Sequence, residues 1–109
     1  MSKQLMVYIT TWCPACRDAQ AALAEWRVTA RLVNIGREPD AAGRVRALTG
    51  FESVPTFVAV EGAGFDPIEP PAPLPPGKSA RGVDRGTVLT EPSRPQMREW
   101  LVKHGFLGW

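Results

Sequence analysis

The sequence of 109 residues has few side chains that bind metal ions through sulfur or nitrogen, because it contains only two cysteines and one histidine. A structural zinc site needs about four ligands. The single histidine, His104, also lies far along the chain from Cys13 and Cys16. We therefore expect no metal site.

The sequence also lacks a long apolar run and a marked excess of either charge. No run approaches the ~20 residues that span a bilayer, and the apolar run at 5–9 is too short for a signal peptide. The formal net charge is only +2, without a basic run. We therefore expect a cytoplasmic monomer that binds neither membranes nor nucleic acid. The length predicts one domain over residues 1–109.

The hydrophobic pattern predicts an α/β fold, with β-branched runs as strands and proline in the first turn of helices. The first strand, helix and second strand form a βαβ unit, whose strands are parallel. The predicted strands are 5–10, 31–35, 56–60 and 87–90, and the predicted helices run from 14 to about 27, from about 38–40 to 50, and from 93 to about 104. The predicted apolar faces are Ala15, Ala19, Leu23 and Trp26, then Ala41, Val45 and Leu48, then Met97, Trp100 and Leu101.

The connection between the third and fourth predicted strands is rich in proline, and we call residues 61–85 the proline-rich segment. Six of the eleven prolines fall between Pro67 and Pro76. This density excludes a helix and favours extended polyproline II backbone. Because a tight turn needs only a few residues, we interpret the segment as an insertion. It is either a passive loop or a ligand for a partner domain.

Cys13 and Cys16 lie at the predicted junction of the first strand and the first helix, in the sequence Trp-Cys-Pro-Ala-Cys. Residues three apart on a helix share a face, so the two sulfurs can form a disulfide. Unpaired N–H groups at the helix N-terminus favour a negative charge on Cys13, and the thiolate is the nucleophile. Cys16 lies one turn inside the helix, where we expect it to be shielded and protonated.

This asymmetry predicts thiol–disulfide exchange. Cys13 attacks a substrate disulfide, and Cys16 then attacks the Cys13 sulfur and releases the reduced substrate. Trp12 flanks the nucleophile and offers an apolar contact. The alternative is an adaptor with a vestigial cysteine pair, which presents the proline-rich segment to a protein partner.

A second motif, Ser53-Val54-Pro55-Thr56, precedes the third predicted strand. Proline cannot donate to a sheet, so it belongs at a strand start. It is either a turn proline or a cis-proline beside the disulfide, where the backbone of Val54 pairs with substrate. Cis bonds are only about 5–6% of X–Pro bonds, so position alone does not decide between these interpretations.

The two motifs together resemble the glutaredoxin-like families, in particular the mycoredoxins and the redoxins that serve ribonucleotide reductase. The likeness covers about 5–60 and 85–104 of the chain. It implies a thioredoxin fold, with a four-stranded mixed sheet in the order 2-1-3-4 and helices on both faces. It also implies a nucleophilic Cys13, a resolving Cys16 and a cis-Pro55.

The resemblance further implies a thiol-disulfide oxidoreductase that reduces protein disulfides or mixed disulfides of low-molecular-weight thiols. Trp12, Pro14, Val54 and Pro55 would contact the substrate, in a groove that continues to the start of the last helix. No cofactor is bound; electrons come from a small thiol or from NADPH through a reductase. Typical glutaredoxins serve glutathione with a lysine before the first cysteine and a Gly-Gly pair before the last helix. This chain has other residues at both places, so a mycothiol-type or reductase-linked system is an equal alternative.

Overall fold

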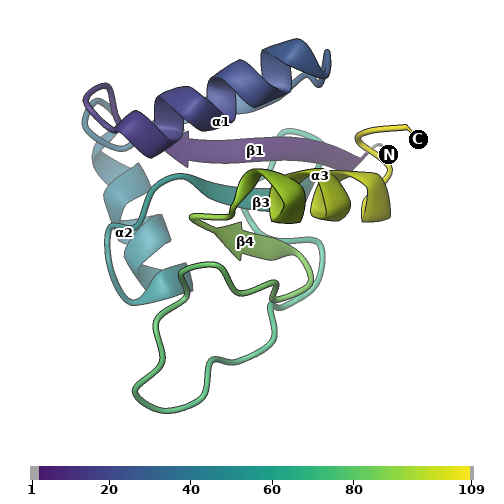
Figure 1. Ribbon diagram of the computed structural model, residues 1–109. Coiled ribbons are helices and arrows are strands. Elements are labelled where there is room, and N and C mark those ends of the chain that lie inside the picture. The colour runs from purple at the N-terminus through teal and green to yellow at the C-terminus, as the bar shows by residue number, and fades with distance from the viewer. Residues whose placement is uncertain (1–2, 109) are drawn as a thin grey trace.

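The computed structural model describes residues 3–108, in which strands and helices alternate through the first half of the chain (Figure 1). All seven predicted elements form, with ends within about two residues of those expected from the hydrophobic pattern. The elements are β1 (Lys3–Ile9), α1 (Pro14–Glu25), β2 (Arg31–Asn34), α2 (Pro39–Thr49), β3 (Thr56–Glu61), β4 (Val88–Thr90) and α3 (Arg94–Lys103).

The strands form one mixed sheet in the order β2-β1-β3-β4, which confirms the predicted order. β1 and β2 are parallel, and the other neighbours are antiparallel. Side chains alternate across β1: Val7 packs with the cluster from α1 and α3, whereas Tyr8 packs with that from α2. Helices therefore cover both faces, as in the thioredoxin fold. No helix within 3–108 is long and apolar enough to span a membrane.

The buried face of α1 differs from the predicted stripe. Ala15 is exposed, and Cys16 takes the inward position in the first turn. The helix ends at Glu25, so Trp26 is the C-cap residue; it is half-buried and packs against the edge of the core. The guanidinium of Arg94 lies 5.7 Å from the centre of the Trp26 ring. The other two predicted faces are buried, except for Leu48, which is half-buried.

The proline-rich segment forms the long loop at the free edge of β4 (Figure 1). Beyond Glu61, which ends β3, it contains no helix or regular strand, but single bridges join Val60 to Pro67, Arg81 to Thr90 and Asp84 to Leu89. The buried side chain of Arg85 donates to the carbonyl of Ala72 at 2.8 Å and also to that of Leu48, at the end of α2. The segment is thus fixed to the sheet and to a helix.

Candidate dithiol site

Cys13 occupies the N-cap of α1, between the end of β1 and Pro14. Its backbone is extended, with φ −84° and ψ 115°, which turns the side chain toward the first N–H groups of the helix. The backbone N–H of Cys16 donates to Cys13 Sγ at 3.1 Å. An N-cap acceptor is stabilised by such donors, and a negative charge on it is stabilised further. The half-buried Cys13 sulfur is therefore the acceptor that caps the first turn of α1.

Cys16 lies directly beneath, and its side chain is 0% exposed. The pKa of the Cys16 thiol is raised to about 12, mainly by burial and, to a smaller extent, by its interaction with Cys13. A thiol with such a pKa is protonated at neutral pH. The two cysteines thus differ in the way that the sequence predicts: one at the helix end, the other sealed in the core.

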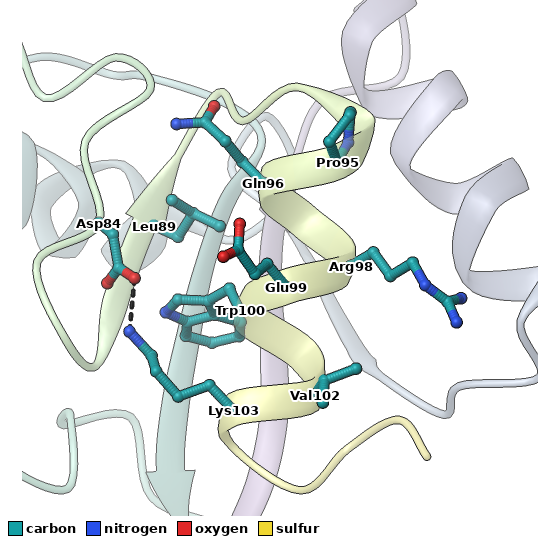
Figure 2. A pocket seen from close by; sticks show the side chains of 9 residues that line it. All are labelled: Asp84, Leu89, Pro95, Gln96, Arg98, Glu99, Trp100, Val102 and Lys103. Atoms are coloured by element: carbon teal, nitrogen blue, oxygen red, sulfur yellow. Dashed lines mark hydrogen bonds and ion pairs between the residues drawn. The ribbon is translucent and has the colours of Figure 1, made fainter. Parts of the chain in front are cut away.

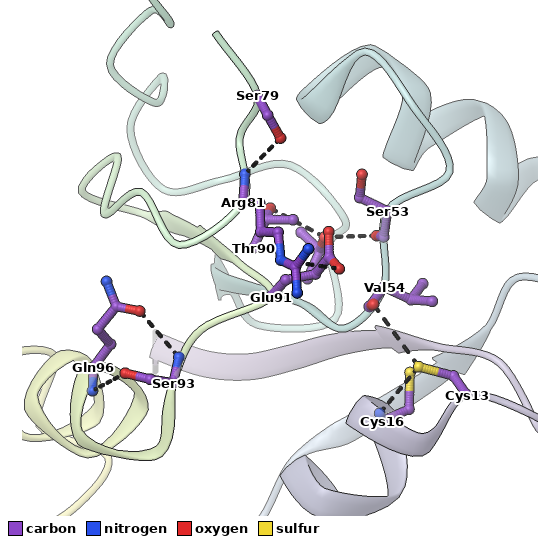
Figure 3. A network of polar contacts seen from close by, with 11 residues as sticks. Cys13, Cys16, Ser53, Val54, Ser79, Arg81, Thr90, Glu91, Ser93 and Gln96 are labelled. Carbon is purple, nitrogen blue, oxygen red and sulfur yellow. Dashed lines mark hydrogen bonds and ion pairs between the residues drawn. The ribbon is translucent and has the colours of Figure 1, made fainter.

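The peptide bond between Val54 and Pro55 is cis, which decides between the two interpretations of this proline. It brings the carbonyl oxygen of Val54 to 3.8 Å from Cys13 Sγ, and the thiol donates to it (Figure 3). Thr56 Oγ1 donates to the carbonyl of Ser53 at 2.8 Å and holds the same loop from the other side. Pro55 is buried. Two segments forty residues apart in the chain therefore meet at the sulfur of Cys13.

Trp12 and Pro14, the other predicted substrate contacts, are both exposed beside Cys13. The Trp12 side chain is 70% exposed. Its ring lies against Gly36, where an added Cβ would be 3.4 Å from the ring edge. The same Cβ would lie 3.2 Å from Asn34 Oδ1, so a side chain at position 36 would crowd Asn34 rather than the ring.

Asn34, at the end of β2, is a positioning residue that the sequence pattern does not reveal. Its Nδ2 donates to Thr11 Oγ1 at 2.9 Å, and its Oδ1 accepts from the N–H of Gly36 at 2.9 Å. The side chain joins the loop before Cys13 to the loop after β2. Asn34 can reach Thr11 because β1 and β2 pair in parallel, which places Asn34 opposite Ile9, the last residue of β1.

A family model provides the first comparison with known proteins. The model of the glutaredoxin family matches residues 5–62, which is more than half of the chain. This chain belongs to the glutaredoxin family. The match extends from β1 through β3, and so includes both cysteines and the cis-proline. A search of curated proteins finds no match.

Two hollows lie near α3 in this glutaredoxin. The larger, of about 540 Å³, runs along the helix beside Leu89, Trp100 and Lys103 (Figure 2), and neither cysteine lines it. The other, of about 440 Å³, lies between α1 and the start of α3, and Asp18 and Ser93 line it. It includes one end of the expected groove, but Val54 and Pro55 do not line it. Within residues 3–108 no three potential metal-binding side chains come together.

Proposed function

We propose that this glutaredoxin reduces disulfides through Cys13 and Cys16. In the first step the Cys13 thiolate attacks one sulfur of a substrate disulfide; a Cys13–substrate disulfide forms, and the other substrate sulfur leaves as a thiolate that takes a proton from water. In the second step Cys16 attacks Cys13 Sγ, and its proton passes to the departing substrate sulfur. The substrate gains two electrons, and the protein retains a Cys13–Cys16 disulfide.

The observation that carries the proposal is the half-buried Cys13 sulfur at the helix N-terminus, which accepts from the N–H of Cys16 and lies within hydrogen-bonding reach of the buried Cys16 thiol. Cys13 itself contributes to the high pKa of Cys16, through a hydrogen bond and through charge. Once Cys13 is in a mixed disulfide, its negative charge is gone and both contributions fall. The resolving thiol then loses its proton more easily, at the stage when it must attack.

The substrates are protein disulfides or mixed disulfides of small thiols. In this proposal the bound substrate contacts Trp12, Pro14, Val54 and Pro55. The exposure of Trp12 and the position of the Val54 carbonyl beside Cys13 support this assignment. The oxidised protein is restored by a mycothiol- or glutathione-type thiol, or by NADPH through a reductase. We place this reaction in the cytoplasm and expect a monomer without a bound cofactor.

A reduction assay with insulin and with a small mixed disulfide tests the proposal. We expect Cys13→Ser to reduce the rate to that of the uncatalysed exchange, because the nucleophile is lost. Cys16→Ser should accumulate the mixed disulfide, visible in the intact mass. An equal rate in wild type and Cys13→Ser would overturn the proposal and favour the adaptor. Mycothiol, glutathione, and thioredoxin reductase with NADPH, supplied separately, identify the reductant.

A further inference from the structure

Residues 79–82 of the proline-rich segment lie against β4 and the first turn of α3. Arg81 bridges to Thr90 in parallel fashion, and the N–H of Gly82 donates to the carbonyl of Thr90 at 2.7 Å. Gln96, in the first turn of α3, donates to the carbonyl of Gly82, also at 2.7 Å. This part of the segment is therefore held by both β4 and α3.

The residue after Thr90 connects this contact to the cis-proline. The N–H of Glu91 donates to the carbonyl of Pro55 at 2.8 Å, and the side chain of Glu91 faces the Arg81 guanidinium (Figure 3). On the other side of the same loop, the carbonyl of Val54 lies 3.8 Å from Cys13 Sγ. Arg81 thus stands beside the loop that borders the nucleophile, although it belongs to a segment outside the region that matches the family.

The Arg81 guanidinium retains unused hydrogen-bonding capacity. Its side chain is 75% exposed, and its Nε lies 3.9 Å from the carboxylate of Glu91. Charge-assisted hydrogen bonds are about 2.7–2.9 Å long, so this ion pair is loose. Within residues 3–108 the guanidinium makes no hydrogen bond, whereas the backbone N–H is fixed by Ser79 Oγ at 3.1 Å. The backbone is held while the charged group is left accessible.

Three other arginines, Arg17, Arg46 and Arg94, already have closer partners for their guanidinium groups. Arg94, at the start of α3, pairs with Glu25 at 2.6 Å, and Arg46 pairs with Glu52 at 2.7 Å. Arg17 lies 3.5 Å from the carbonyl oxygen of Trp12. A guanidinium has five donors in a planar fork that matches a carboxylate. Arg81 has the loosest ion pair of this group and the most exposed side chain among those paired.

We propose that Arg81 is a specificity-determining residue, which binds a substrate carboxylate next to the reacting disulfide. This inference rests on the proposed function. The carboxylate can belong to a small thiol or to an acidic side chain of a protein substrate, since the chemistry is the same. A preference of roughly two- to fivefold in kcat/KM corresponds to about 0.4–1 kcal/mol, which lies within the range for an exposed ion pair.

The experiment compares disulfides that differ in a single carboxylate. The small-thiol arm uses the hydroxyethyl mixed disulfides of N-acetylcysteine and of its amide. The peptide arm uses end-blocked peptides with Glu or Gln next to the disulfide-bonded cysteine. We expect wild type to favour the charged substrate about two- to fivefold in at least one arm, Arg81→Gln to remove the preference, and Arg81→Glu to reverse it. The arm that shows the preference identifies the source of the carboxylate.

Arg98→Gln is the matched control, because Arg98 is also exposed but projects from α3 next to Trp26. It removes the same charge and should leave the preference unchanged. Equal preferences in wild type and Arg81→Gln, or an equal loss in Arg98→Gln, would overturn the inference. If wild type reduces the neutral substrates, the proposed function stands whatever the result for Arg81; if it reduces none, the proposed function itself fails.

Discussion

At the scale of single residues, burial gives two nearby cysteines opposite chemical properties. Cys13 follows a turn, and its sulfur accepts a hydrogen bond from an N–H of the helix. Cys16 is instead enclosed by the core between the sheet and α1. The difference depends on the start of α1 at Pro14, which leaves Cys13 outside the helix and Cys16 inside it. A helix that began one residue later would lose this arrangement.

This difference predicts selective alkylation of the reduced protein. Because the pKa of Cys16 is about 12, only about one molecule in ten thousand holds it as a thiolate at pH 8. We expect iodoacetamide to modify Cys13 alone in the native protein and both cysteines in urea. Peptide mapping by mass spectrometry measures this. Labelling of Cys16 as fast as Cys13, or rapid labelling of native Cys13→Ser, would contradict the prediction.

At the scale of elements, local patterns predicted the strands and helices but not every buried face. The stripe through Ala15, Ala19 and Leu23 fits helical spacing, yet the helix turns Cys16 inward instead. Both stripes include Ala19 and Leu23, so periodicity alone does not separate them. Trp26 packs against the core as predicted but is only half-buried, because α1 ends one residue before it.

Some residues around the candidate site could be predicted from the sequence, and others could not. The paired cysteines and Pro55 follow from motifs that are short in sequence. Asn34 and Arg81 depend instead on which strands and loops become neighbours, and pairing between distant segments leaves no periodic signal in either one. For the proline-rich segment, composition predicted the absence of regular structure but not the buried Arg85.

Replacing Arg85 tests whether its side chain anchors the proline-rich segment. Its side chain is 9% exposed and donates to the carbonyls of Ala72 and Leu48. Arg85→Ala leaves both carbonyls without this donor, so we expect the free energy of unfolding to fall by about 2–3 kcal/mol. Urea denaturation followed by tryptophan fluorescence measures it. Lys78→Ala, an exposed change in the same segment, should stay within about 0.5 kcal/mol of wild type. Similar values for both variants would show that Arg85 does not anchor the segment.

At the scale of the whole molecule, β1 runs between the dithiol site and the C-terminal end of α3. Cys13 lies beyond the end of β1, in the connection to α1, whereas the C-terminal end of α3 lies near the beginning of β1 (Figure 1). There His104 Nε2 lies 2.7 Å from the carbonyl oxygen of Gly86, and its ring centre is 4.4 Å from that of Trp100. The Trp100 indole N–H donates to the same carbonyl at 2.8 Å. The last helix and the residue after the proline-rich segment are thus joined far from the sulfurs.

His104 makes this junction sensitive to pH. Burial lowers the pKa of His104 below its ordinary value of 6.5, as do Lys3 and Lys103, while the Gly86 carbonyl and Asp84 act in the opposite direction with smaller total effect. Between the folded and unfolded pKa values the unfolded chain therefore binds more protons, so stability rises with pH. The contribution of His104 is complete above pH 6.5 and is lost as the pH falls toward its folded pKa.

We therefore expect the free energy of unfolding to decrease from pH 7.5 to pH 5.5, and to decrease less in His104→Gln. The comparison is clean because the chain has only one histidine. Urea denaturation at pH 7.5, 6.5 and 5.5 measures the difference between the two proteins. The free energy of unfolding of wild type minus that of His104→Gln should decrease as the pH falls. A constant difference would mean that the imidazole has the same proton affinity in the folded and unfolded states. Since the length of β1 separates His104 from Cys13, the disulfide-exchange rate of His104→Gln at pH 7.5 should equal that of wild type.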